Sequence, residues 1–395
     1  MANKKEKPEG KVVTKYDKKV QKRKQEELKA ARSKKITVIT SIVIALALIT
    51  ALVVTVWTNY DKVNHKYIAV DGDNISETEF DFYYGIAKQN VMNQTLYGSM
   101  TYQSYFTSYL GYDASKADSQ QNYSSTDNTW YDYFANNTVT SIKEFKALLK
   151  DAEEKGFSYD SEDTDYAEFQ DSISKAADSD GKSVSEYYKA VFGSHASESK
   201  LKPYVCEYLK AVAYQAKLQN DLKATDQEIA DYYASNKDTY DTVDYRLFSV
   251  EAETESSQIS MEQAKEKADA MAAAVTDEAS FAQLCRANAT SDKTDTYADD
   301  AASLVQDKTK SSMESQVADW MYADGRHAGE VSVIEDTTNN KYDVVYFISR
   351  TKPATADETI SSTLLSQKYN EIITGYTDNM TVDNVHNRIK MLTEK

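Results

Sequence analysis

The sequence contains little glycine, proline, histidine or cysteine, and each shortage excludes a class of protein. With Gly 11 and Pro 3 among 395 residues, the chain is neither collagen-like nor a proline-rich disordered polymer. The histidines show no HxxxH or HExxH spacing, so the sequence predicts no metal site and no cofactor. A phosphate-binding glycine loop and a GxSxG motif are also absent, which removes the commonest signals of nucleotide enzymes and hydrolases. The four histidines are His65, His195, His327 and His386.

The only two cysteines, Cys206 and Cys285, have neither CxxC spacing nor a histidine nearby. Both lie in helix-like apolar stretches, PYVCEYL and FAQLCRA, where a buried free thiol is a common state. A disulfide is permitted outside the cytoplasm, but the sequence favours free thiols.

What the chain has in abundance is helix-forming residues and tyrosine. Few helix breakers and many Ala, Lys, Glu, Gln and Asp favour helix, and 30 Tyr stand against 11 Phe. Hydrophobic residues make up 41% of the chain and charged residues 28%, which is enough apolar material for a buried core. The length of 395 residues predicts two or three folding units.

The charge is divided between two opposed parts of the chain. Residues 1–35 hold fourteen Lys or Arg and five Asp or Glu, a net +9, which leaves −26 after Lys35 within the total of −17. The following segment, 36–57, has 22 residues without a charge, and about 20 apolar residues suffice to cross a bilayer. The sequence therefore predicts a basic cytoplasmic tail at 1–35, a transmembrane anchor at 36–57 and, by the positive-inside rule, an extracytoplasmic bulk.

Two alternatives compete with the anchor and its tail. A cleaved signal peptide has an apolar region of about 7 to 15 residues and small residues at its cleavage site, whereas Trp57, Thr58, Asn59 and Tyr60 follow here. A nucleic-acid-binding arm also has clustered Lys and Arg, but beside an apolar span these residues are better explained by topology and anionic lipid headgroups. A net charge of −26 after the tail repels nucleic acid and favours basic or unfolded partners.

The region 58–238 is predicted to be mostly helix and loop. The segment 66–70 (KYIAV) has a β-type composition, and the turn after it leads to Ser76-Glu77-Thr78-Glu79, a capping box at a helix start. A second capping box, Thr225-Asp226-Gln227-Glu228, opens another helix near the end of the region.

The segment 97–137 departs from this helical pattern, because tyrosines are set among Ser, Asp, Asn and Gln. The favoured interpretation is a polar surface insertion with partial helix. The other is a surface that grips client proteins, since Tyr offers rigid amphipathic contact area. Neither interpretation implies chemistry.

A change of period predicts a second domain at 240–352. The run VDYRLFSV at 243–250 has strand character, helices are expected at 261–274 and 281–287, and YDVVYFI at 342–348 forms the last strand. These elements make a small α/β domain.

The remaining segments complete the predicted fold class, which is α+β. The stretch 289–312, rich in Asp, Thr and Ser, is predicted to be a loop before a helix at about 313–322. The segment 353–395 is helical again, and its apolar face needs a partner, so we expect it to pack on the first helical domain. The α/β domain is therefore predicted to be inserted between helical parts.

The motifs IAVDGDNISETEF, GFSYDSEDTDYAEF, LKPYVCEYL and ATDQEIADYYASNKDTYDTVDYRLFSV follow one another within residues 66–352. Together they resemble the PrsA/SurA class of extracytoplasmic foldases, and TDQEIADYY, SFAQLCRANATSD and AGEVSVIED are the most specific pieces. The resemblance implies a helical, SurA-like chaperone domain that carries a parvulin-type peptidyl-prolyl isomerase (rotamase) domain.

Both histidines typical of parvulins are replaced in this sequence. In Arg246-Leu247, Leu247 stands where the resemblance implies the first histidine, and Asp343 stands in place of the second. The GGDLG turn of the family is replaced by DDAAS at 299–303. The resemblance therefore implies a domain whose isomerase activity is weak or lost.

Four further residues are candidates for the site on the same resemblance. Asp292 matches a position where parvulins have Asp or Cys, which makes it the candidate catalytic residue. Met313, Val317 and Trp320 resemble the residues that bind the proline ring, although a stripe at this spacing is more often simply helix core.

The function predicted from these features is that of a membrane-anchored extracytoplasmic folding factor. It binds unfolded or newly exported polypeptides and has a parvulin-like domain of weak or no activity. The alternatives are an active peptidyl-prolyl isomerase, a non-catalytic adaptor of the cell envelope and, last, a hydrolase without a recognisable motif. A homodimer through the helical domain is left open.

Overall fold

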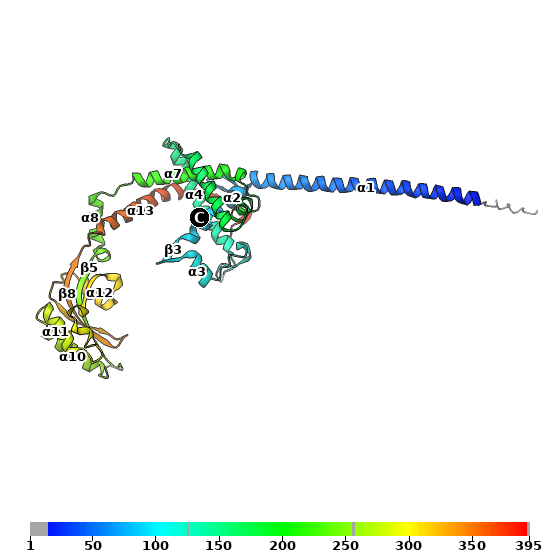
Figure 1. Ribbon diagram of the computed structural model, residues 1–395. Coiled ribbons are helices and arrows are strands. Elements are labelled where there is room, and N and C mark those ends of the chain that lie inside the picture. The colour runs from blue at the N-terminus through cyan, green and yellow to red at the C-terminus, as the bar shows by residue number, and fades with distance from the viewer. Residues whose placement is uncertain (1–14, 125, 255–256, 393–395) are drawn as a thin grey trace, which may run out of the picture. The chain divides into compact units, whose positions relative to one another are not determined.

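The computed structural model describes residues 15–124, 126–254 and 257–392. The chain divides into two compact units: unit 1 takes in the chain up to Gln215 and from Gly375 onward, and unit 2 is Ala216–Thr374 (Figure 1). Residues 1–14 of the predicted cytoplasmic tail lie outside the described residues.

The long helix α1 (Lys15–Asn64) contains the predicted anchor. Within the described residues, Val43–Lys62 is the one stretch long and apolar enough to cross a membrane, with a mean hydropathy of 1.9. Its large apolar side chains are exposed, among them Leu52 at 65% and Val56 at 67%. Length and composition fit a membrane anchor and a signal sequence alike.

Unit 1 is mainly helical, and its two small sheets are short. In the three-stranded antiparallel sheet, β1 lies between β2 and β9, and β9 pairs through Ala69 with Asp383 and Val70 with Val382. After α1, the elements are β1 (Lys66–Val70), β2 (Asp73–Ser76), α2 (Glu77–Asn93), β3 (Thr95–Tyr97), β4 (Met100–Thr101), α3 (Tyr102–Tyr109), α4 (Trp130–Glu154), α5 (Glu162–Ser179), α6 (Val184–Phe192), α7 (Glu198–Asp221) and β9 (Val382–Asp383), with short 3-10 turns at Asp118–Gln120 and Val385–Asn387.

The capping box predicted at the start of α2 is half formed. Ser76 accepts a hydrogen bond from the amide of Glu79 at 3.2 Å, as expected. The Glu79 carboxylate forms an ion pair with Lys146 of α4 at 3.1 Å. The second box, Thr225 with Glu228, is confirmed in unit 2.

The tyrosine-rich segment is a core element rather than a surface insertion. Trp130 is 0% exposed and Tyr112 4%, and they form one cluster with Phe106, Phe134 and Met92. The ring centroids of Trp130 and Phe106 are 4.8 Å apart, and those of Trp130 and Tyr112 are 4.9 Å apart. The prediction of a surface insertion was based on the polar residues between the aromatic ones. These polar residues form turns, while the aromatic rings point into the core. Tyr109, at 66% exposed, is an exception.

Unit 2 is built around a four-stranded antiparallel sheet with the order β6-β5-β8-β7. The predicted central strands are confirmed, but two edge strands were missed. β6 lies inside the stretch predicted to be a loop, because its sequence LVQDKT is polar and mostly solvent-facing, as edge strands tolerate. The elements are α8 (Asp226–Ser235), α9 (Lys237–Tyr240), β5 (Thr242–Glu251), α10 (Met261–Ala274), α11 (Glu278–Asn288), β6 (Leu304–Thr309), α12 (Ser315–Met321), β7 (Val331–Asp336), β8 (Lys341–Thr351) and α13 (Ala356–Thr377), with 3-10 turns at Thr296–Ala298, Asp300–Ser303 and Lys310–Ser312.

The two faces of this sheet are covered by different helices. Phe248 of β5 and Val344 of β8 face α10 and α11 and pack with Met271 and Phe281. The other face carries a cluster with α12, whose buried members are Val243, Tyr245, Val317, Met321, Tyr322, Val345 and Phe347. The alternation of side chains along a strand produces this division, and α12 is too short to cover its face completely.

Both cysteines are free thiols, as the sequence favoured. Cys206 lies half-buried in α7, and Cys285 is buried in α11. Burial raises the pKa of the Cys285 thiol to about 11, which disfavours the reactive thiolate at neutral pH.

Candidate functional site

The candidate site lies on the α12 face of the unit 2 sheet. Leu247, Met313 and Trp320 pack against the buried cluster there and remain partly accessible. Val317 is only 3% exposed, so it is helix core, the bland interpretation weighed from the sequence. The structure thus brings together Leu247 and the three residues compared with a proline-binding surface. We call Leu247, Met313 and Trp320 the open apolar face.

Trp320 is held in place by a neighbouring cation. The guanidinium carbon of Arg326 lies 3.8 Å from the centre of its ring, and Arg326 also donates to the Trp320 carbonyl at 3.1 Å. Arg326 forms an ion pair with Glu330 as well. A planar guanidinium stacked on indole fixes the ring orientation and covers one of its two faces.

Asp343, which replaces the second parvulin histidine, is fully engaged. It is 1% exposed and lies on β8 directly opposite Ser249 of β5. The Ser249 hydroxyl donates to its Oδ1 at 2.5 Å, and the Lys341 ammonium lies 3.0 Å from its Oδ2. Each carboxylate oxygen therefore already has a donor, which leaves Asp343 poorly suited to bind a substrate carbonyl or amide.

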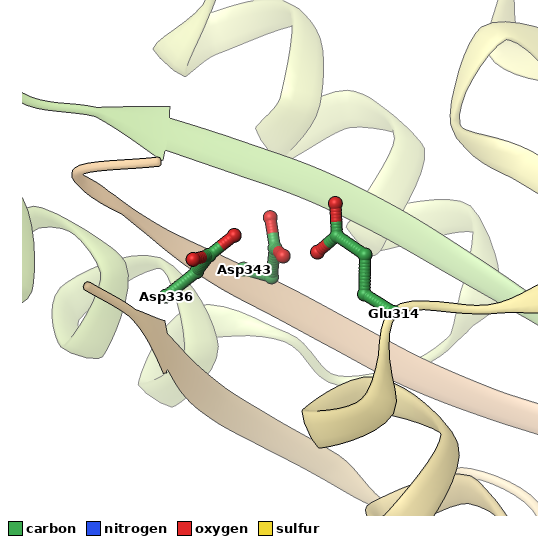
Figure 2. A group of neighbouring side chains, drawn as sticks. All are labelled: Glu314, Asp336 and Asp343. Atoms are coloured by element: carbon green, nitrogen blue, oxygen red, sulfur yellow. The ribbon is translucent and has the colours of Figure 1, made fainter. Parts of the chain in front are cut away.

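Lys341 is the centre of an ion cluster with three carboxylates. Its ammonium lies 3.0 Å from Glu314 and 3.7 Å from Asp336, in addition to Asp343. Figure 2 shows the three carboxyl groups converging from β7, β8 and the segment before α12. One oxygen of each lies within 4.8 Å of the others.

The electrostatics of the cluster follow from burial and from this single cation. Burial raises the pKa of Asp343, and the bonds from Ser249 and Lys341 counteract only part of that shift. Burial alone would lower the pKa of Lys341, but the hydrogen bonds and charges of Asp343 and Glu314 outweigh it, so its pKa is raised. The pKa of Asp336 is lowered, first by the side-chain hydrogen bond from Asn339.

The same contacts determine whether a metal ion could bind to these carboxylates. Asp336 is occupied by the β7–β8 turn, since it accepts from the amides of Thr338 and Asn339 at 3.0 and 3.1 Å. The Lys341 ammonium already pairs with all three carboxylates and compensates part of their negative charge. A divalent cation would have to displace this ammonium, so these residues are better explained as an ion cluster than as a metal site.

Asp292, the candidate catalytic residue, is placed elsewhere. It is exposed in the loop after α11, beside Lys293, whose ammonium pairs with Glu251. The helix α11 packs on the face of the sheet opposite α12, and Asp292 lies in the loop that follows α11. The structure therefore does not join Asp292 to the open apolar face.

Arg246, the neighbour of Leu247, faces the opposite side of the sheet. Its guanidinium binds Glu278 at 3.0 Å, the carbonyl of Asp300 at 2.5 Å and the Ser303 hydroxyl at 2.9 Å. Arg246 thus ties the start of α11 and the 3-10 turn at Asp300–Ser303 to β5. These contacts give it a structural role.

Sequence reasoning missed Ser249, Lys341, Glu314 and Asp336. The alternation along β8 offered one signal, because Lys341 and Asp343 are two residues apart and share a face of the strand. Ser249 depends on the pairing register of β5 and β8, and Glu314 and Asp336 on the ends of other elements, so neither follows from local sequence.

Comparison with known proteins places a family domain on this unit. Residues 224–359 match the family described as the PPIC-type PPIASE domain, and this range encloses the predicted 240–352. None of the curated proteins matches the chain.

Three solved structures are similar to much of the chain at low identity. Foldase protein PrsA from Streptococcus pneumoniae is 17% identical, with 72% of this chain and 92% of that chain covered and a TM-score of 0.26. PrsA from Bacillus subtilis is 16% identical, with 67% and 93% covered and a TM-score of 0.20. A SurA-like chaperone from Campylobacter jejuni is 13% identical, with 82% and 97% covered and a TM-score of 0.26. The predicted resemblance is confirmed: residues 224–359 match the PPIC-type PPIASE domain, and the chain is similar to PrsA and to SurA-like chaperones.

Proposed function

We propose that this protein is a membrane-anchored extracytoplasmic folding factor that binds unfolded polypeptides and whose PPIC-type domain is a weak or inactive isomerase. The observation that carries the second part is that Asp343, which stands in place of the second parvulin histidine, is already bound by Ser249 and Lys341. The first part is supported by the family match and by relatives that are described as a foldase and as chaperones.

Prolyl isomerisation makes a specific demand on such a site. No covalent bond breaks, and the barrier of about 18 to 20 kcal/mol comes from amide resonance. A catalyst must bind the twisted amide better than the planar one, with an apolar slot for the ring and fixed polar groups near the carbonyl. Here Leu247 adds an apolar side chain where the polar geometry is needed, and Asp343 is occupied by its own donors. The open apolar face keeps the ability to bind.

The anchor and the location rest on charge and length. Val43–Lys62 satisfies the length and hydropathy of a span, and a net +9 precedes it within residues 1–35. Protease protection of the tail in intact cells, with digestion of both units after the wall is removed, is the expected result. A homodimer through unit 1 belongs to the same proposal and is tested by light scattering of the full chain in detergent.

Holding activity is tested with the full chain in phosphatidylcholine nanodiscs. Reduced lysozyme, which is basic, and reduced α-lactalbumin, which is acidic, serve as aggregating test proteins. We expect the chain to slow aggregation of reduced lysozyme at stoichiometric ratios, more than that of α-lactalbumin, because the chain after Lys35 carries −26. Equal aggregation with and without the chain for both proteins would refute the chaperone function.

Isomerase activity is tested on the same sample by exchange NMR of a short Ala-Pro peptide. We expect the uncatalysed exchange time of tens to hundreds of seconds. A second candidate function, an active isomerase, is favoured by the open apolar face. Acceleration that disappears in Met313→Ala would establish that function and overturn the proposed loss of activity. If Asp292→Ala abolished it instead, the catalytic group would be Asp292.

A further inference from the structure

Unit 1 contains a cavity of about 460 Å³ that is lined by residues of this unit alone. One wall is a single face of α2, formed by Asp81, Tyr84, Gly85, Lys88 and Met92, whose spacing places them along one side of a helix. The volume falls within the range of ligand pockets, about 300 to 1,000 Å³. Residues at the end of α6 and the start of α4 also line the cavity.

Close packing of α2 and α6 brings the backbone of Gly193 against Asp81. A Cβ atom added at Gly193 would lie 2.4 Å from Oδ2 of Asp81, and the residue has a φ of +89°. A Cβ at Gly85 would lie 2.8 Å from Phe192 and from the Val191 carbonyl. Both glycines are therefore needed for this approach, and the approach holds the Asp81 carboxylate at the cavity wall.

The Asp81 carboxylate has no hydrogen-bond donor among the residues that the structure describes. The two nearby cations are already neutralised: Lys62 forms an ion pair with Glu77, and Lys88 lies 2.6 Å from Asp118. The wall of the cavity thus presents one uncompensated negative charge. A partly buried carboxylate without a hydrogen-bond donor marks a place where a cation would be bound favourably.

Aromatic rings line the cavity beside this charge. The rings of Tyr84 and Tyr131 stack with centroids 5.3 Å apart. Their hydroxyls are engaged elsewhere, because Tyr84 donates to Asp118 at 2.6 Å and Tyr131 is bonded to Tyr67 at 2.5 Å. The rings are therefore fixed in place, and tyrosine faces attract ammonium and guanidinium groups. Met92 offers apolar surface for the aliphatic stem of such a side chain.

We propose that this cavity binds an arginine or lysine side chain of an extended polypeptide, with Asp81 as the counterion and Tyr84 and Tyr131 as the aromatic walls. The site selects one basic side chain at a time, because it offers one free negative charge. The inference rests on the proposed polypeptide-binding function and assigns to it a side-chain preference. The −26 charge after Lys35 attracts the same class of ligand over a longer range.

The site is sensitive to pH in the neutral range. Burial, followed by the charge of Glu77, raises the pKa of Asp81 to about 7, and Lys62 opposes this shift. Burial also raises the pKa values of the nearby Tyr67, Tyr84 and Tyr131, so these tyrosines stay neutral below pH 9. His195, on which Lys62 and Glu77 also act, has a pKa that burial lowers. Binding of a basic side chain is thus expected to strengthen from pH 6 to pH 8, as Asp81 loses its proton.

The test uses the full chain in phosphatidylcholine nanodiscs and isothermal titration calorimetry. The probe is the peptide acetyl-Gly-Ser-Arg-Ser-Gly-amide, and its matched neutral form has citrulline in place of arginine. We expect the arginine peptide to bind at least tenfold more tightly at pH 8 than the citrulline peptide, which corresponds to about 1.4 kcal/mol. Asp81→Asn should abolish this difference, whereas Asp178→Asn, at an exposed position of α5, should leave it in place.

Three outcomes would overturn the inference. These are equal binding of the two peptides, an arginine preference that persists in Asp81→Asn, and binding of free acetyl-arginine-amide as tight as that of the peptide, which would indicate a small cation as the ligand. Failure of the proposed function is distinguishable, because that function is read from aggregation of the test proteins. Slowed aggregation without an arginine preference would refute the inference alone.

Discussion

Replacing Lys341 by methionine tests whether one ammonium holds the ion cluster of unit 2 together. Met keeps the length of the side chain and removes its charge, so Asp343, at 1% exposed, loses the contact at 3.0 Å and keeps only the Ser249 bond. Breaking a buried ion pair costs about 3 to 5 kcal/mol when the remaining charge is uncompensated. Asp343 can escape by taking up a proton, which at pH 7 costs about 4 kcal/mol for an ordinary Asp pKa near 3.9.

The expected loss is therefore about 3 to 4 kcal/mol at pH 7 and falls to about 1.5 kcal/mol at pH 5, where protonation is easier. The sign follows from linkage, because the pKa of Asp343 in the variant is raised further. Stability is then retained at low pH and lost as pH rises from the unfolded pKa toward the folded one.

Unfolding of unit 2 can be followed in the full chain through Cys285, which is buried and becomes reactive to iodoacetamide only on unfolding. With a urea dependence of about 2 kcal/mol per molar, the labelling midpoint should fall by about 1.5 to 2 M at pH 7 and by less than about 1 M at pH 5. Lys265→Met is the matched control, because its pair with Asp269 is exposed and contributes less than about 1 kcal/mol. An effect of Lys341→Met equal to that of the control, or unchanged between pH 5 and pH 7, would refute this reasoning.

Three further predictions concern unit 1 and the open apolar face. Asp81→Asn should stabilise unit 1 increasingly from pH 4 to pH 7, by up to about 4 kcal/mol, because the pKa of Asp81 is raised to about 7 and its ionisation therefore costs stability as pH rises. Urea titrations of the variant and the parent at each pH measure this difference, and a difference that does not change with pH would contradict the prediction. Trp130→Ala should cost unit 1 about 3 to 5 kcal/mol through loss of its buried ring, against less than about 0.5 kcal/mol for the exposed Tyr109→Ala; equal urea midpoints would disprove the aromatic core. Trp320→Ala should weaken binding of a proline peptide about tenfold in NMR titrations while the Cys285 labelling midpoint moves by less than about 1 M; unaltered binding would exclude the open apolar face as the peptide site.

The fold was predictable where local rules apply. Apolar alternation located β5 and β8, and the Thr225 cap located α8, because these signals are contained in a few consecutive residues. β6 was missed because an edge strand with one exposed face needs little apolar sequence. The aromatic core around Trp130 was missed because its members gather from three separate elements.

The site was predictable only in part. Resemblance pointed to Leu247, Met313, Val317 and Trp320, and they do gather on one face of the sheet. The state of Asp343 was not predictable, since its partners are fixed by strand register and by an element end. A carboxylate in place of a histidine suggests a polar group open to substrate, and only the contacts at 2.5 and 3.0 Å show that it is engaged.

The strand pair β1–β9 has a consequence for the order in which the chain folds. Lys66 and Asp383, which form an ion pair across it, are 317 residues apart, whereas all of unit 2 lies between them. Within unit 2, Lys368 donates to the Lys223 carbonyl across 145 residues and pairs with Glu228, so the folded unit clasps its own two ends. That clasp roughly halves the loop that β1 and β9 must close, which is worth only about 0.5 kcal/mol.

The order in which residues become available during synthesis therefore matters more for folding than the entropy of closing this loop. When the chain is synthesised or exported from its N-terminus, the inserted unit has every residue it needs before β9 emerges. Until β9 is available, the sheet of unit 1 has an unpaired edge on β1. The protein therefore completes its own folding late, when its last strand, β9, pairs with its first strand, β1.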